Sequence, residues 1–326
     1  MKHYTFVDYA TQGYIAFVGL IVLVFHGASL PIWPWLLLAH GVGLNLIHGW
    51  IQLTVRFPTS RLLDFLRHYY PIPLFIGLYS ETELLNQLFF TGYLDAGFLR
   101  LEQAVFGLQP GLEFMLRFPA TWLAEVFYAA YFSFYLMIAG VGLALLLRNR
   151  RQFAHFISVV SFVLYVCYTI YIFLPVVGPR IVDLNLPGVS LPQAALPAAN
   201  YDPPPSVQCA FFFRIMGWFY DHFEAAGAAF PSSHVAVAIC TVYFSFLYLR
   251  RIRHIHLLAA ILLCVSTVYG RYHYVVDVVA GIVTAAVLIP LGNRLYFKFA
   301  ERDQAGCAGV KPKPAAPRII HQTARS

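Results

Sequence analysis

The sequence contains few charged residues: Asp, Glu, Lys and Arg make up only 11% of its 326 positions. A soluble protein has about a quarter of such residues, whereas here 60% of the positions are hydrophobic and the mean hydropathy is +0.67. This composition excludes an ordinary soluble domain and indicates an integral membrane protein. Lysine is especially scarce, and the lysines lie near the two ends of the chain, at Lys2, Lys298, Lys311 and Lys313.

Two further absences narrow the possible chemistry. The five cysteines show no paired spacing, which argues against a disulfide framework and against a zinc knuckle. They are Cys167, Cys209, Cys240, Cys264 and Cys307. No Gly-x-Ser-x-Gly motif is present, so a serine hydrolase that uses Ser233 and His234 does not fit the sequence.

Apolar runs long enough to cross a bilayer, roughly 20 residues each, recur along the chain. We place them near 13–30, 33–55, 71–90, 120–147, 153–175, 231–249, 255–270 and 272–297. The third run is the weakest because polar residues such as Glu81 and Glu83 interrupt it. We therefore predict an all-α integral membrane fold with about eight transmembrane helices. The first run lacks a convincing cleavage site, so we interpret it as a retained anchor.

The runs divide the chain into three parts. Residues 1–55 are predicted to form an N-terminal transmembrane hairpin, and residues 56–300 a membrane core. Within the core, the proline-rich connection at 176–229 is long enough to be a functional lid or a disordered segment. Its aromatic end favours docking on the membrane or on protein. Residues 301–326 are predicted to be a disordered cytoplasmic tail.

The basic residues are distributed unequally between the two sides of the predicted bundle. When successive loops are assigned to alternate sides, all but five of the 22 lysines and arginines fall on one side. The five exceptions are Arg100, Arg117, Arg180, Arg214 and Arg271. Such an asymmetry places the basic loops in the cytoplasm, and it explains the net charge of +7 without nucleic-acid binding. The 176–229 connection then lies on the extracytoplasmic side of the membrane.

Two polar clusters stand at the mouths of apolar runs on that extracytoplasmic side. The first contains Pro231, Ser232, Ser233 and His234. Pro231 suits the first turn of a helix, and the helix N-terminus that follows would attract an anion such as phosphate. The alternative is that Pro-Ser-Ser only caps the helix and that His234 is a polar interface residue.

The second cluster contains Arg271, His273 and Asp277. On a helix, His273 and Asp277 share a face, so Asp277 can bond one ring nitrogen and leave the other as a nucleophile or base. Arg271 can grip phosphate. The alternatives are that His273 and Asp277 form a purely structural pair, and that the Arg271 side chain only extends to the membrane interface. Ionisable residues this close to hydrocarbon are costly, which favours function.

These clusters resemble the type 2 phosphatidic acid phosphatase superfamily, which is marked by Lys-x6-Arg-Pro, Pro-Ser-Gly-His and Ser-Arg-x5-His-x3-Asp. The second motif corresponds to residues 231–234, with Ser233 in place of glycine, and the third aligns without gaps on 266–277. Thr267 replaces the arginine of the third motif, and we expect Arg271, one helical turn later, to supply its charge. The lysine of the first motif is missing, and Arg180 is the nearest counterpart of its arginine, with Arg214 as a weaker candidate.

The resemblance implies a six-helix phosphatase-like core and a metal-independent reaction without a cofactor. His273, oriented by Asp277, would attack the phosphorus and form a phosphohistidine, and His234 would protonate the departing oxygen. Arg180, Arg271 and the N–H groups near Ser232 and Ser233 would hold the phosphate oxygens. The implied partners are the membrane and a lipid phosphate or phospholipid substrate.

Three functions remain open from the sequence. Two patterns, Gly178-Pro179-Arg180 and the Arg-Tyr-His-Tyr run at 271–274, resemble the inositol phosphorylceramide synthase branch of the superfamily more than its simple phosphatases. This resemblance implies transfer of a phospho-headgroup between lipids. The alternatives are a lipid-phosphate phosphatase, acting on phosphatidate or polyprenyl phosphate, and a non-enzymatic lipid-binding or lipid-moving protein with a degenerate site.

Several polar residues lie outside the two clusters. His40 and His48 could be metal ligands, but hydrogen bonds between helices suit them better. The remaining carboxylates in the outer halves of the predicted spans could bind an acceptor headgroup or pair with arginines. They are Glu81, Glu83 and Glu125.

Overall fold

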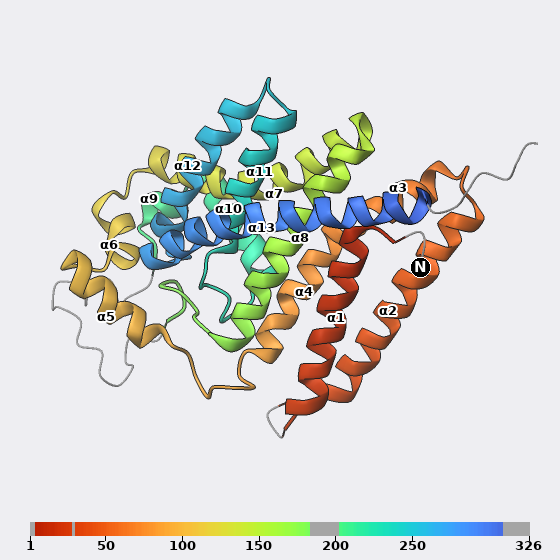
Figure 1. Cartoon of the computed structure of the whole chain (residues 1–326). Helices are drawn as coiled ribbons and strands as arrows, with labels where there is room; N and C mark the ends of the chain where they lie inside the picture. The colour runs from red at the N-terminus through yellow and green to blue at the C-terminus, as the bar shows by residue number, and fades with distance from the viewer. Residues whose placement is uncertain (1–3, 28–29, 183–201, 309–326) are drawn as a thin grey trace, which may run out of the picture.

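The computed structural model describes residues 4–27, 30–182 and 202–308, and the described residues form a helical bundle (Figure 1). Each of the eight predicted apolar runs coincides with a helix. These helices are α1 (Phe6–Phe25), α2 (Trp33–Arg56), α4 (Pro71–Leu85), α7 (Thr121–Arg148), α8 (Arg150–Phe173), α11 (Ser233–Tyr248), α12 (Arg253–Tyr269) and α13 (Val275–Ala308).

Five of these helices, α1, α2, α7, α8 and α13, are long and apolar enough to cross a membrane, and α11 and α12 are shorter apolar helices. The weak third run gives the 15-residue helix α4, which ends at Leu85 instead of residue 90. The fold is therefore that of an all-helical integral membrane protein, as predicted.

The remaining helices are short and connect the long ones. They are α3 (Arg61–Tyr69), α5 (Asp95–Phe106), α6 (Pro110–Arg117), α9 (Pro205–Gln208) and α10 (Phe211–Phe223). Helices α9 and α10 lie within the long 176–229 connection, whose residues 183–201 are outside the described residues. The aromatic end of this connection docks on protein, because α10 packs along α7.

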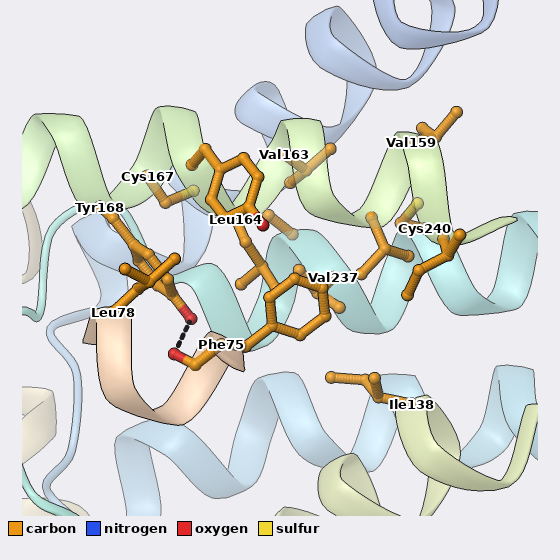
Figure 2. Packing of buried hydrophobic residues seen from close by; sticks show 14 of the residues in the cluster. Phe75, Leu78, Ile138, Val159, Val163, Leu164, Cys167, Tyr168, Val237 and Cys240 are labelled. Atoms are coloured by element: carbon orange, nitrogen blue, oxygen red, sulfur yellow. Dashed lines mark hydrogen bonds between the residues drawn. The ribbon is translucent and has the colours of Figure 1, made fainter. Parts of the chain in front are cut away.

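Helix α8 occupies the centre of the bundle and packs against α1, α4, α7, α11 and α13. Figure 2 shows part of this packing, in which Leu164 and Tyr168 of α8 lie near Phe75 of α4. The Tyr168 hydroxyl donates to the Phe75 carbonyl oxygen at 3.2 Å. Cys167 and Cys240 are buried within this core as ordinary apolar side chains.

Helix α1 begins at Phe6, earlier than the predicted start at residue 13. Asp8, in the first turn of this helix, is fully buried and neutralised by partners. Its carboxylate accepts hydrogen bonds from the Thr5 backbone N–H and from the Tyr70 hydroxyl, and it forms an ion pair with Arg67. These contacts tie α1 to the segment that joins α3 and α4, and they remove the cost of a buried charge.

The polypeptide alternates between two ends of the bundle. At one end lie the basic turns that join α7 to α8 and α11 to α12. The opposite end carries the start of α11, the end of α12 and the start of α13. In Figure 1, α5, α6 and α9 gather on the left, far from α3 on the right.

Helix α13 continues to Ala308, so the first part of the predicted disordered tail is helical, and residues 309–326 lie outside the described residues.

Candidate active site

Three segments that are distant in the sequence meet at the end of the bundle that carries the start of α11. The segment before Arg180 pairs with the segment before α11, because the Ala229 N–H donates to the Val176 carbonyl at 2.8 Å and the Val176 N–H donates to Gly227 at 3.2 Å. The Ser232 N–H in turn donates to the Asp277 carbonyl oxygen at 3.1 Å. These bonds bring the three predicted motif regions to one place.

The first polar cluster differs in detail from the prediction. Helix α11 begins at Ser233 with Ser232 as its N-cap, so Pro231 precedes the helix instead of occupying its first turn. The Ser232 hydroxyl accepts a hydrogen bond from the Val235 N–H at 3.3 Å, as N-cap side chains do. The Ser233 N–H donates to the Tyr171 hydroxyl at 3.1 Å. The N–H groups of Ser232 and Ser233 are thus engaged within the protein, which favours the capping alternative for Ser232.

The second cluster forms the predicted histidine–aspartate contact. His273 Nδ1 lies 3.4 Å from Asp277 Oδ2, and both side chains are buried. Helix α13 begins only at Val275, so His273 lies in the turn before the helix rather than on its first turn. The same Asp277 oxygen accepts a hydrogen bond from the Tyr274 N–H at 2.8 Å, which holds the turn against the helix. Because Asp277 contacts the Nδ1 edge of the ring, the Nε2 edge points away from this carboxylate.

His234 lies beside His273, with 5.8 Å between the ring centroids. Its Nε2 atom is 3.1 Å from the Tyr131 hydroxyl oxygen, and its ring contacts Phe134 at a centroid distance of 4.5 Å. Sequence reasoning missed Tyr131, because a tyrosine within an apolar run carries no motif signal. The tyrosine hydroxyl and the surrounding rings set the orientation of His234.

Arg180 reaches the site from the long connection. Its guanidinium lies over the Tyr220 ring, 4.0 Å from the centroid, and 5.8 Å from the Tyr272 centroid. The Tyr220 and Tyr272 rings are stacked at 4.5 Å. Arg180 Nη1 also lies 3.3 Å from Glu224 Oε2. Cation–π contact and one carboxylate therefore hold this cation beside the two histidine motifs.

Arg271 is buried and has a left-handed backbone, with φ of 63°, which is uncommon for a residue other than glycine. Helix α12 ends at Tyr269, so Arg271 lies in the turn between α12 and α13. The expectation that it stands one helical turn beyond Thr267 is therefore wrong, since the helix ends between the two residues. Arg180 nevertheless reaches the same turn, because its guanidinium lies 5.8 Å from the ring centroid of Tyr272, the residue that follows Arg271 in the sequence.

Two fully buried carboxylates on α5 support this site, and the sequence analysis missed both. Asp95 accepts hydrogen bonds from the N–H groups of Val177 and Gly178, each at 2.9 Å. Glu102 accepts one from the Val275 N–H at the start of α13. Burial raises the pKa of Asp95, against the effect of its hydrogen bonds, and burial raises the pKa of Glu102 to about 7. The spacing of Asp95, Leu99 and Glu102 places all three on one helix face. This spacing was the feature of the sequence that could have predicted the burial of both carboxylates.

The other predicted polar residues lie in structural contacts. His40 pairs with Glu81 across α2 and α4 at 3.2 Å, and His48 contacts the Tyr4 hydroxyl, so both histidines bond between segments as expected. Glu125 accepts hydrogen bonds from the N–H groups of Phe211 and Phe212 at the start of α10. Arg214, the weaker counterpart of Arg180, donates to the Gln208 carbonyl oxygen in α9.

A cavity of about 450 Å³ opens beside His234 and Ser233. Its walls come from α4, α7, α8 and α10 and are mostly apolar, and Glu224 lies among the few polar residues that line it. His273 and Asp277 are not among the lining residues. A mainly apolar cavity with a few convergent polar groups at one end is the usual form of a small-molecule site.

Comparison with known families agrees with this geometry. A family model described as the PAP2 superfamily matches residues 97–291, more than half of the chain. The chain belongs to the PAP2 superfamily. No curated protein and no solved structure matches the chain.

The PAP2 match extends from within α5 to within α13 and includes Arg180, Ser232, Ser233, His234, Arg271, His273 and Asp277, whereas Asp95 lies two residues before it. Helices α1 to α4 lie before the matched region. Membership indicates a phosphatase-type enzyme that acts on phosphate esters.

Proposed function

We propose that the protein is a membrane-embedded lipid phosphoesterase or phosphotransferase that acts through a phosphohistidine on His273. The observation that carries this proposal is the arrangement of His273, Asp277 and His234. One histidine is held by a buried carboxylate at 3.4 Å, and the second histidine ring lies 5.8 Å away at the end of an apolar cavity.

The first half-reaction uses both histidines. The His273 Nε2 lone pair attacks the phosphorus and forms a P–N bond while the ester P–O bond breaks. The departing oxygen takes a proton from protonated His234, and Asp277 stabilises the positive charge that develops on His273. Arg180 and Arg271 offset the charge on the phosphoryl oxygens. Phosphate must compete with Glu224 for Arg180, because that carboxylate holds the cation in this structure.

The second half-reaction decides between hydrolysis and transfer. Water or an alcohol gives its proton to His234, its oxygen attacks the phosphorus, and the P–N bond breaks. Transfer to a lipid alcohol is favoured by the sequence pattern around Arg180 and His273. It is also supported by the apolar cavity beside His234, which offers such an acceptor a place. Hydrolysis of a lipid phosphate is the alternative outcome of the same intermediate.

The site is proposed to face the extracytoplasmic side. Support comes from the basic turns, since Arg148, Arg150 and Arg250 lie at the opposite end of the bundle from His234 and His273. Positively charged loops are retained in the cytoplasm. A lipid substrate in the outer leaflet then has direct access to the site.

The test is turnover by purified protein in detergent, with phosphatidate or a phospholipid as donor, with and without an added lipid alcohol. We expect His273→Ala to lower turnover by roughly three orders of magnitude or more, and the matched control His254→Ala, at an exposed position near the opposite end of the bundle, to be unchanged. Phosphorylated alcohol in place of free phosphate identifies transfer. Turnover that survives in His273→Ala rejects the phosphohistidine, and no turnover of any ester by the unmodified protein favours the non-enzymatic alternative.

A further inference from the structure

The cavity beside His234 runs along two helices that do not close against each other. On α7 its lining residues are spaced as one helix face: Tyr131, Phe134, Tyr135, Ile138 and Ala139. On α4 they are again one face: Ile72, Phe75, Ile76 and Tyr79. Both helices pack on α8, and the cavity occupies the space between them. With a rise of 1.5 Å per residue, these faces extend about 10–12 Å along the helices.

The inner end of the cavity is closed. There the Tyr69 hydroxyl donates to the Ala139 carbonyl oxygen at 3.3 Å, which joins the end of α3, just before α4, to α7. Gly142, one turn further along α7, packs so closely on Ile72 that a Cβ atom would lie 2.9 Å from its Cδ1. An occupant of the cavity therefore meets a wall at Ile72 and Ala139.

One side of the cavity opens toward the surface through apolar residues. Ile76 of α4 is 48% exposed, Phe223 of α10 is 39% exposed and Trp218 is 55% exposed, although all three line the cavity. Ile76 lies near the middle of α4, within an apolar run. A rim of this kind opens to the hydrocarbon of the bilayer rather than to water, so an apolar molecule can enter without crossing a polar surface.

The polar end of the cavity is defined by one of the two histidines only. His234 and Ser233 line it, whereas the nucleophile His273 does not. In the proposed reaction His234 faces the oxygen that leaves the phosphorus. A group held in the cavity is therefore attached through that oxygen and departs as the alcohol, while the phosphoryl group stays on His273.

We propose that this cavity binds the hydrocarbon tail of the leaving alcohol, and that the wall at its inner end, at Ile72 and Ala139, sets the tail length that the enzyme prefers. The proposal rests on the proposed function and extends it to the part of the substrate that is distant from phosphorus. Selection by tail length then depends on α4 and α7, because a single apolar tail lies between these two helices. The same cavity then receives the tail of an acceptor alcohol if the second half-reaction is transfer.

The experiment uses a series of monoalkyl phosphates of increasing chain length, turned over by the full-length protein in detergent. For the unmodified protein, kcat/KM is expected to rise by up to about fourfold per methylene group and to level off once the tail reaches the inner wall. Ala139→Phe fills the closed end, so it should move the plateau to shorter chains and lower kcat/KM for the longest ester about tenfold or more. The shortest ester should be turned over at an unchanged rate.

Gly140→Phe is the matched control, because Gly140 is the neighbouring residue on α7 and has open space where a side chain would begin. It adds the same ring outside the cavity and should leave the whole series unchanged. An equal loss on short and long esters in Ala139→Phe, or a rate for the unmodified protein that does not depend on chain length, overturns the proposal. If the unmodified protein turns over no ester of any length, it is the proposed function that fails.

Discussion

The hydroxyl of Tyr274 donates a hydrogen bond of 2.9 Å to Asp95 Oδ1, across 179 positions of sequence. The same carboxylate accepts bonds from the N–H groups of Val177 and Gly178. One buried side chain on α5 therefore joins the segment that leads to Arg180 with the turn that carries His273. Gly178 is required there, since its φ is +86° and a Cβ would lie 2.5 Å from the Tyr272 carbonyl oxygen.

Replacing Asp95 with asparagine is expected to lower kcat/KM by about 10- to 100-fold. Three donors converge on the two carboxylate oxygens, whereas an amide offers one acceptor oxygen and turns its own N–H groups toward the remaining donors. Tyr274→Phe removes one donor only and should have a smaller effect. The decisive measurement is a double-mutant cycle with Arg180→Ala. If Asp95 positions Arg180, its replacement costs much less in the Arg180→Ala background, whereas additive losses would show a purely structural role.

The pKa of Glu102 predicts how stability depends on pH. Burial raises this pKa from 4.5 to about 7, so the folded protein binds the proton more tightly than the unfolded chain does. Below pH 4.5 the side chain is protonated in both states and there is no penalty. As the pH rises from 4.5 through 7, the protein loses stability, by about 3 kcal/mol in total.

Glu102→Gln should remove this dependence. The variant is expected to gain thermal stability relative to the unmodified protein between pH 5 and pH 8, as measured by the difference in Tm at each pH. Glu113→Gln is the control, because Glu113 on the neighbouring α6 pairs with the exposed Arg117. A difference in Tm that stays constant with pH for Glu102→Gln would contradict the assignment.

Asp277→Asn is expected to lower kcat by roughly three orders of magnitude while KM changes little. The amide can still occupy the space beside His273 Nδ1, but it cannot balance the positive charge that the ring acquires when Nε2 attacks. Single-turnover measurements that follow the phosphoenzyme should show slower formation. Asp221→Asn, at an exposed position on α10, serves as the matched control. A large increase in KM at unchanged kcat would show that Asp277 acts on binding instead.

Cys209 provides a test of the side on which the site lies. It is exposed in the long connection beside α9, whereas Cys167 and Cys240 are buried. A membrane-impermeant thiol reagent should therefore label the Cys307→Ser variant of the protein in intact cells. This labelling should disappear when Cys209→Ser is introduced as well. Labelling of Cys209 that requires permeabilised cells would place the site in the cytoplasm.

Several features were accessible from the sequence because they depend on composition and motif order. The apolar runs predicted the long helices, and the motif spacing predicted that His234, His273 and Asp277 would meet. Helix boundaries were harder to predict, because Asp8 is neutralised by Arg67, a partner 59 positions away. Thr267 and Arg271 were assumed to share a helix that ends between them.

The supporting residues of the site escaped prediction for a different physical reason. Asp95 and Glu102 are acidic residues on a short helix, and acidic residues on such helices usually face water. Their burial depends on backbone N–H groups of Val177, Gly178 and Val275, which come from distant segments. The hydrogen bond of the Ser232 N–H could not be predicted either, because its acceptor is the main-chain carbonyl oxygen of Asp277.

Gly281 of α13 has a consequence for how this protein can diversify. A Cβ at this position would lie 2.6 Å from the Ser232 carbonyl oxygen, so α13 and the start of α11 meet backbone against backbone. The relative position of the two segments that carry the histidines is therefore determined by main-chain contact. Tyr131 and Phe134 of α7 orient His234, but Ile72 and Ala139 lie at the other end of the cavity. Mutations at that other end can change which molecules are accepted without moving the reacting groups, so selectivity and chemistry are free to evolve separately.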